Sequence, residues 1–186
     1  MSKINSILDH FEGRGTVRKV LIDNRTGEVV KDFGDHNLIV KTGRTALIRM
    51  LAGELNTSIT KMAIGSGGTA DLGENAFNPI APVDGDSALT QKVATVSISS
   101  RNVDVSNTNP RVTFVALFDC AAVNSLVNEC GLFFTDGTTM FARHTFDTVS
   151  LKASSNFSLQ ISWTIEFYFI KRRVILRLMH IKERRF

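Results

Sequence analysis

The stretch Phe157–Phe169, FSLQISWTIEFYF, alternates apolar and polar side chains with a period of two. One set of positions is apolar: Phe157, Leu159, Ile161, Trp163, Ile165 and Phe167. The set between them is polar: Ser158, Gln160, Ser162, Thr164 and Glu166. A period of two sustained over this length is typical of a long β-strand with one buried and one solvated face. We therefore expect this strand to line the core of an antiparallel β-protein.

Two hairpins are predicted upstream of this strand. Asp136-Gly137 separates the apolar stretches 128–135 and 138–146, and Asp-Gly is a strong signal for a type I′ turn. Residues 23–27, DNRTG, separate two further alternating stretches in the same way. Additional short strands are expected at 37–40, 58–65, 89–99, 103–105 and 111–118.

One internal helix is expected, with Thr42 as its N-cap, an end near Ala52 and Gly53 as its stop. The segment from Ser66 to Ser87 is rich in glycine and is expected to be a long functional loop or interaction arm. Many antiparallel strands, tight turns and one helix favour a mainly β fold, an antiparallel β-sandwich with one short helix and extended terminal arms.

The two ends of the chain differ from this body. Residues 1–12 carry apolar side chains at helical spacing and predict a short amphipathic helix that needs a covering partner. Residues 171–186 hold seven of the chain's 22 Lys and Arg residues and one acid, Glu183, among many apolar residues. We divide the chain into an N-terminal arm (1–15), a β-sandwich body (16–170) and a basic, apolar C-terminal extension (171–186).

The arms supply the candidate interaction residues: Ile4, Ile7, Leu8, Phe11, Arg172, Arg173, Ile175 and Leu178. Because the extension is too apolar for a free polybasic tail, we expect it to dock on a neighbouring subunit. A solvated extension and a nucleic-acid contact are the alternatives. The other 170 residues hold 15 basic and 17 acidic residues. The body therefore lacks the basic excess typical of a nucleic-acid-binding domain, and we do not expect nucleic acid as a partner.

Two features in the long loop invite a cofactor or metal interpretation. Gly65–Ala70, GSGGTA, matches a dinucleotide-binding pattern, but no amphipathic helix follows it, so a flexible strand-exit turn is expected. Four acidic residues follow it at spacings that match no calcium-binding loop: Asp71, Glu74, Asp84 and Asp86. We expect a solvated acidic loop, with a bound cation as the alternative, and no cofactor.

A nucleophilic pair is the remaining chemical candidate. The predicted Asp136-Gly137 hairpin places Cys130 and His144 on facing strands, as a thiol and a base would require. Cys130 lies between Glu129 and the apolar residues 132–134, no group for an oxyanion hole is evident, and His144 is expected at the surface or the rim of the sheet. Cys120 and Cys130 are expected to be buried free thiols, with no disulfide and no metal-ligand spacing. We expect no catalytic site and no small-molecule substrate.

No apolar run reaches the roughly 20 residues that span a bilayer, and the first residues, MSKINSILDHFEGRG, do not read as a secretory signal. A protein made and kept in a cytosol, without a membrane span, is expected.

Five stretches carry a set of short motifs: NLIVKTGR (37–44), ITKMAIGSG (59–67), NECGLF (128–133), MFARHTF (140–146) and LQISWTIEF (159–167). Together they resemble a group of tailed-bacteriophage virion structural proteins, which includes baseplate, tail-fibre and neck-collar components. The resemblance covers about residues 35–168, and the basic extension after Phe169 departs from it. It implies a protein that carries no catalytic residues and works by assembly.

These observations predict a non-enzymatic structural subunit of a phage tail, found in the virion and in the host cytoplasm during assembly. It would assemble with itself and with other virion proteins as a ring, a collar or a fibre-attachment adaptor. A receptor- or glycan-binding module of a tail fibre is the alternative, although such a module needs exposed aromatic rings and Trp163 lies on the predicted core face. A depolymerase-type enzyme is a third alternative that no motif supports.

Overall fold

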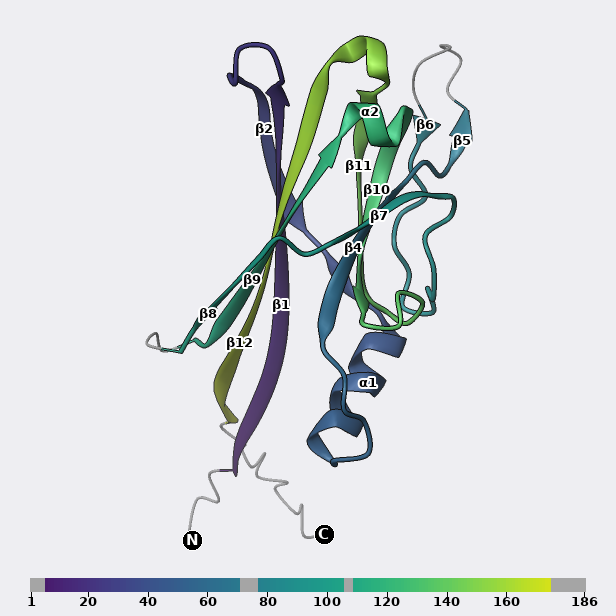
Figure 1. Ribbon diagram of the computed structural model, residues 1–186. Coiled ribbons are helices and arrows are strands. Elements are labelled where there is room, and N and C mark those ends of the chain that lie inside the picture. The colour runs from purple at the N-terminus through teal and green to yellow at the C-terminus, as the bar shows by residue number, and fades with distance from the viewer. Residues whose placement is uncertain (1–5, 71–76, 106–108, 175–186) are drawn as a thin grey trace, which may run out of the picture.

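Two five-stranded antiparallel sheets form a β-sandwich, as the strand pattern predicted (Figure 1). The strand order is β2-β1-β12-β9-β8 in the first sheet and β3-β11-β10-β4-β7 in the second. The computed structural model describes residues 6–70, 77–105 and 109–174. For residues 6–12, 69–70, 77 and 169–174 it describes the backbone alone.

The strands of the first sheet are β1 (Ser6–Asp23), β2 (Val29–His36), β8 (Ser100–Asp104), β9 (Arg111–Asp119) and β12 (Phe157–Val174). Those of the second are β3 (Leu38–Ile39), β4 (Ile59–Gly65), β7 (Lys92–Ser97), β10 (Ser125–Phe134) and β11 (Met140–Leu151). The helical elements are α1 (Lys41–Leu51), α2 (Cys120–Val123) and the 3₁₀ turn η1 (Ala153–Ser155). Two short strands, β5 (Thr69–Ala70) and β6 (Phe77–Asn78), pair within the segment expected to be an unstructured loop.

The central strand is β12, which contains the alternating stretch. It pairs with β1 along its whole length, from Ser6 opposite Val174 to Asp23 opposite Phe157, and with β9 on its other side. Its apolar set faces the core, where four side chains are buried: Leu159, Ile161, Trp163 and Ile165. The prediction of one buried face is confirmed.

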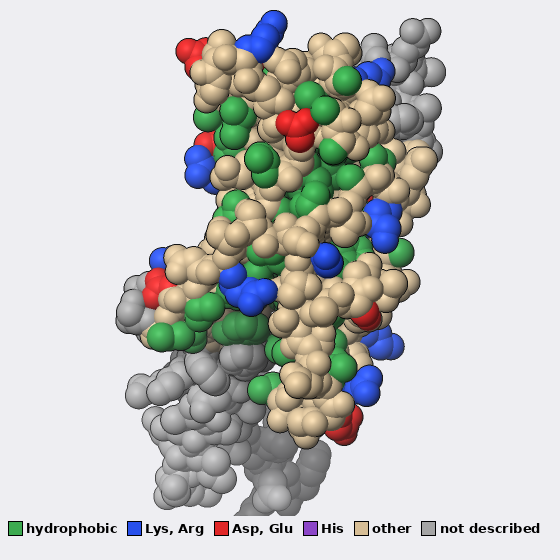
Figure 2. Space-filling model, in the orientation of Figure 1, with side chains coloured by type: hydrophobic (Ala, Val, Ile, Leu, Met, Phe, Trp, Pro, Cys, Tyr) green, Lys and Arg blue, Asp and Glu red, His purple; other side chains and the backbone are tan. Residues whose placement is uncertain are grey.

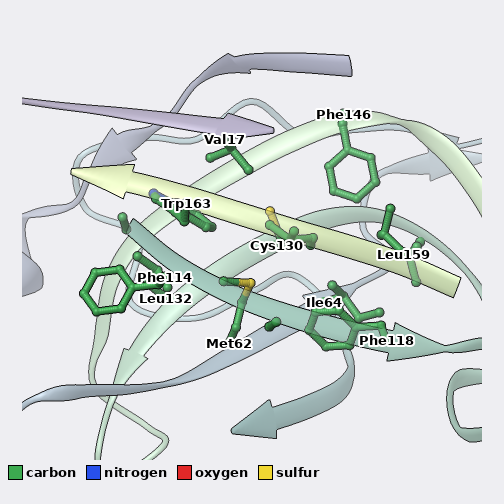
Figure 3. Packing of buried hydrophobic residues seen from close by; sticks show 14 of the residues in the cluster. Val17, Met62, Ile64, Phe114, Phe118, Cys130, Leu132, Phe146, Leu159 and Trp163 are labelled. Atoms are coloured by element: carbon green, nitrogen blue, oxygen red, sulfur yellow. The ribbon is translucent and has the colours of Figure 1, made fainter. Parts of the chain in front are cut away.

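The core lies between the two sheets (Figure 3). Trp163 of β12 and Val17 of β1 come from one sheet, and Cys130 and Leu132 of β10 from the other. Cys120 and Cys130 are buried and free, as expected. The largest fully buried side chain in the described residues is that of Trp163, so this residue contributes much of the apolar area that stabilises the sandwich.

Both predicted hairpins are present, but the expected type I′ turn at Asp136-Gly137 is wrong, because only Gly137 of these two residues has the positive φ that such a turn requires at both. Gly27 ends the turn between β1 and β2 with φ of 74°, and Gly137 lies between β10 and β11 with φ of 68°. These left-handed backbone conformations favour glycine. In the second turn, the Asp136 carboxylate accepts hydrogen bonds from the backbone N–H groups of Thr138 and Thr139, which fixes the turn.

The predicted helix at residues 1–12 is wrong for the part that the structure describes. From Ser6 onward the chain is strand β1, paired residue by residue with β12. A single helix of about 12 residues is marginal in water, whereas this ladder satisfies the backbone of both strands. β12 also runs to Val174, so the first four residues of the expected C-terminal extension are paired with β1.

Helix α1 was predicted at nearly the correct place, but its cap was not. Val40 is the N-cap residue, and the Thr42 hydroxyl instead donates to the Met140 carbonyl oxygen at 2.8 Å. Gly53, with φ of 73°, follows the end of the helix as expected. Gly43 packs so closely on β11 that a Cβ there would overlap the Phe141 backbone. α1 thus lies against the end of the second sheet. Within the described residues, no helix has the length and apolar character needed to cross a membrane.

Candidate interaction surface

The ends of β1 and β12 form a two-stranded ribbon that continues past the rest of their sheet (Figure 1). β2 pairs with β1 only from Thr16 onward, and β9 pairs with β12 only as far as Glu166. We call residues 6–15 and 167–174 the terminal ribbon. Among the described strands, none pairs with residues 6–15 on the side away from β12. An unpaired strand edge of this kind is a template for pairing with another chain.

The terminal ribbon brings together predicted interaction residues from opposite ends of the sequence. Ile7 is opposite Arg173, and Leu8 is opposite Arg172, in the β1–β12 ladder. Phe11 lies in the same strand, opposite Phe169. The other three predicted residues, Ile4, Ile175 and Leu178, lie outside the described residues. The structure therefore pairs the two predicted segments with each other, and the N-terminal one is a strand where the sequence predicted a helix.

A hollow of about 620 Å³ lies beside the ribbon, and we call it the ribbon groove. Its walls come from β1, the β2–β3 connection, α1 and β12. The lining residues are Gly13, Arg14, Gly15, His36, Asn37, Leu38, Ile39, Arg44, Leu47, Ile48 and Phe167. No single stretch of sequence predicts this groove, because it forms only where four distant segments meet.

Glycines make the β1 wall of the groove almost bare backbone. A Cβ at Gly13 would approach the ring of Phe167 to 2.9 Å, and a Cβ at Gly15 would overlap the side chain of Asn37. At both positions a Cβ would force the facing side chain to move, so glycine permits the observed close packing. The side-chain amide of Asn37 is buried there, and neither its nitrogen nor its oxygen has a hydrogen-bond partner in the described structure.

Helix α1 forms the apolar wall, and much of its apolar surface is uncovered. Only Gly43 and Ala46 are buried, whereas Ile48 is 65% exposed and Leu51 is 78% exposed. On the other side of Leu47 and Phe167 lies a second hollow of about 230 Å³, lined almost entirely by apolar side chains. Figure 2 shows apolar side chains reaching the surface between polar ones on this face of the molecule. Apolar surface of this kind around a helix is typical of an interaction site.

Charged side chains near the groove are already engaged. Arg44 forms an ion pair with Asp84 at 2.7 Å and also donates to the Ile39 carbonyl oxygen at 2.7 Å. The Arg14 guanidinium lies 5.3 Å from the centre of the Tyr168 ring, which is a cation–π distance. The rim is therefore polar around an apolar floor, the usual anatomy of a protein interface.

The Cys130–His144 pair lies where the sequence placed it, but it does not form an activated nucleophile. The two residues are opposite each other in the β10–β11 ladder. The expected rim position of His144 is wrong, because this residue is buried. Its Nε2 lies 2.6 Å from Lys19 Nζ, and its Nδ1 lies 2.9 Å from the His36 carbonyl oxygen. Burial raises the pKa of the Cys130 thiol to about 12, so this thiol stays protonated near neutral pH.

The glycine-rich turn and the acidic loop have structural contacts. The Gly67 N–H donates to the Asn128 side-chain oxygen at 2.9 Å, and the Asn128 amide donates back to the Gly67 carbonyl oxygen at 2.7 Å. Asp84 and Asp86 form ion pairs with Arg44 and Arg143. Asp71 and Glu74 lie outside the described residues, and within those residues no three acidic, His or Cys side chains gather as a metal site.

Comparisons of this chain with models of known protein families, with curated proteins and with solved structures gave no match.

Proposed function

We propose that this chain is a non-enzymatic structural subunit of a bacteriophage tail. It assembles with copies of itself and with neighbouring virion proteins as a ring, a collar or a fibre-attachment adaptor. It occupies the virion and, during assembly, the host cytoplasm. The motif resemblance over residues 35–168 supports the class of protein, and the surface beside the terminal ribbon supports assembly as the activity.

The observation that carries this proposal is the unpaired edge of β1 next to the exposed apolar side of α1. An open strand edge offers a row of backbone donors and acceptors, and apolar side chains beside it offer area to bury. A subunit that binds through both the strand edge and the apolar side chains is held at a defined angle to its neighbour, because strand pairing fixes register and orientation. That mechanical role needs no reactive group, in keeping with the protonated Cys130 thiol.

The test is to locate the protein and measure its assembly. Light scattering of the purified full chain should give a mass above 20.5 kDa that grows with concentration. Mass spectrometry of purified phage particles from the same source should detect the chain in fixed ratio to a major tail protein. A chain that is monomeric at every concentration and absent from particles would refute the proposal.

A receptor- or glycan-binding role is the second candidate, and one observation favours it. A shallow hollow of about 650 Å³ on the first sheet is lined by polar groups that can bind sugar hydroxyls, among them Thr16, Arg18, Asp32, Ser162 and Thr164. Trp163 is fully buried and so cannot stack on a sugar there. Binding to a glycan array that is lost in Asp32→Ala, with assembly unchanged, would favour this role over the structural one.

A further inference from the structure

We infer that the ribbon groove binds the C-terminal segment 175–186 of a second copy of this chain, which adds as an extended strand to the unpaired edge of β1. This inference rests on the proposed assembly function and deepens it by naming the site and its occupant. It makes the contact between subunits head-to-tail where one copy gives its segment to a second copy and receives a segment from a third. Contacts of that type close into rings when the rotation between subunits permits.

The backbone of β1 is the first step of the argument. Successive residues of a strand direct their N–H and C=O groups to opposite neighbours. Gly15 directs its carbonyl away from β12, since that oxygen accepts from the Asn37 backbone N–H at 3.2 Å. Gly13 is therefore the next residue whose backbone groups face the groove, and no described strand pairs with them. A strand laid in the groove would continue the ladder that β2 leaves at Thr16.

The wall opposite this edge is suited to a peptide with apolar side chains. Leu47, Ile48 and Phe167 supply apolar area. The segment 175–186, ILRLMHIKERRF, has six apolar residues: Ile175, Leu176, Leu178, Met179, Ile181 and Phe186. Its bases would remain on the polar rim, where long cationic side chains reach water.

Length and position favour a second copy over the same chain. The free edge from residue 6 to residue 14 spans about 30 Å, and twelve extended residues span about 40 Å, so the segment is long enough. In its own chain the segment begins after Val174, on the β12 side of β1, and would have to cross β1 to enter the groove. It would then have to reverse its direction around the end of β1, and the residues in that turn could not pair with the free edge.

The experiment uses the full chain with a photo-reactive residue in place of Ile48, which is exposed at the groove. Unlabelled and ¹⁵N-labelled chains are mixed, irradiated and digested, so that links between copies differ in mass from links within one. We expect links from position 48 to residues 175–186 of the differently labelled copy. A photo-reactive residue in place of Leu117, 50% exposed on β9, is the control and should not reach that segment.

A substitution gives an independent readout. Ile48→Glu places a charge in the groove and should weaken association at least tenfold, whereas Leu117→Glu should leave it unchanged. Circular dichroism and melting curves check that both variants fold. Assembly with links to any other segment, or only within one chain, overturns this inference and leaves self-assembly standing. A full chain that never associates overturns both the inference and self-assembly.

Discussion

The Lys19 ammonium group lies 2.6 Å from Nε2 of His144, with both residues buried between the sheets. Lys19 also lies against the rings of Phe33 and Phe146, at 5.0 and 5.3 Å from their centres. The other imidazole nitrogen, Nδ1, lies 2.9 Å from the His36 carbonyl oxygen and donates to it, so Nε2 is the acceptor for Lys19. His144 is therefore neutral in the folded protein.

The first prediction concerns pH. Burial, and then the charge of Lys19, lower the pKa of His144 from 6.5 to about 4. The unfolded chain protonates His144 more readily than the folded protein does. The contribution of neutral His144 to the free energy of unfolding is therefore complete above about pH 6.5 and is lost as the pH falls towards 4. This contribution to the free energy of unfolding amounts to about 3 kcal/mol. Urea unfolding from pH 4 to pH 7 should show this loss. In His144→Gln the free energy of unfolding should depend much less on pH over the same range. The same pH dependence in that variant would contradict the low pKa of His144.

The second prediction concerns the Lys19 charge itself. Lys19→Met keeps a long side chain but removes the cation next to His144. The pKa of His144 should then rise, yet remain below 6.5, because burial is its largest cause. NMR titration of the imidazole protons measures this directly. A pKa that does not change would mean that Lys19 does not contact His144 in solution.

The third prediction concerns a buried ion pair. Arg143 donates to Glu129 at 2.7 and 3.1 Å and to Asp86 at 2.8 Å, and the Gln91 N–H donates to Glu129 at 3.0 Å. Because Arg143→Met leaves the Glu129 carboxylate buried without its cation, it should lower the free energy of unfolding by about 3–5 kcal/mol. Urea unfolding of the unchanged chain and of Arg143→Met measures this loss.

Its matched control is Arg18→Met, which removes an exposed ion pair. Arg18 and Asp32 are 2.6 Å apart, but their side chains are 64% and 42% exposed. Breaking such a pair should leave the free energy of unfolding almost unchanged, since water and salt screen it. Equal effects of Arg18→Met and Arg143→Met would show that burial does not decide the strength of these contacts.

Several of these elements were predictable from local sequence. Apolar and polar residues around Trp163 in β12 alternate with a period of two, and the Asp136-Gly137 pair predicts the position of a turn. Lys19 also lies in phase with Val17 and Leu21, so its inward direction could be read from the pattern although lysine is rarely buried. Burial of this lysine depends on His144, which is 125 residues away in sequence.

The N-terminal strand and the groove were beyond local sequence reasoning. Residues 6–12 have apolar residues at helical spacing, and their strand partner, β12, begins only at Phe157. Pairing with β12, which is distant in sequence, therefore outweighs the helical periodicity of residues 6–12. The groove depends on Gly13, Asn37 and Ile48, which have no common motif and meet only in the folded chain.

The fourth prediction concerns the core. Trp163 is fully buried against both sheets, and Trp163→Ala should lower the free energy of unfolding by about 3–5 kcal/mol. Val103→Ala, at an exposed position on β8, should change it by less than about 0.5 kcal/mol. Thermal and urea unfolding measure both. Unchanged stability in Trp163→Ala, together with lost glycan binding, would point to a receptor-binding surface instead.

The last prediction concerns the basic end of the chain. If it bound DNA, each phosphate neutralised would release a counterion, and the logarithm of the binding constant would fall with the logarithm of salt concentration by about 0.9 per contact. Replacement of Arg172, Arg173, Arg177, Arg184 and Arg185 by Gln in the full chain would then abolish binding. We expect only weak DNA binding that these changes hardly alter, since the apolar residues of 175–186 would gain nothing from phosphate. The salt dependence of association between copies should likewise be shallow, because apolar burial and backbone pairing supply its energy. Tight, steeply salt-dependent DNA binding that is lost in the Gln variant would instead make this end of the chain a nucleic-acid contact.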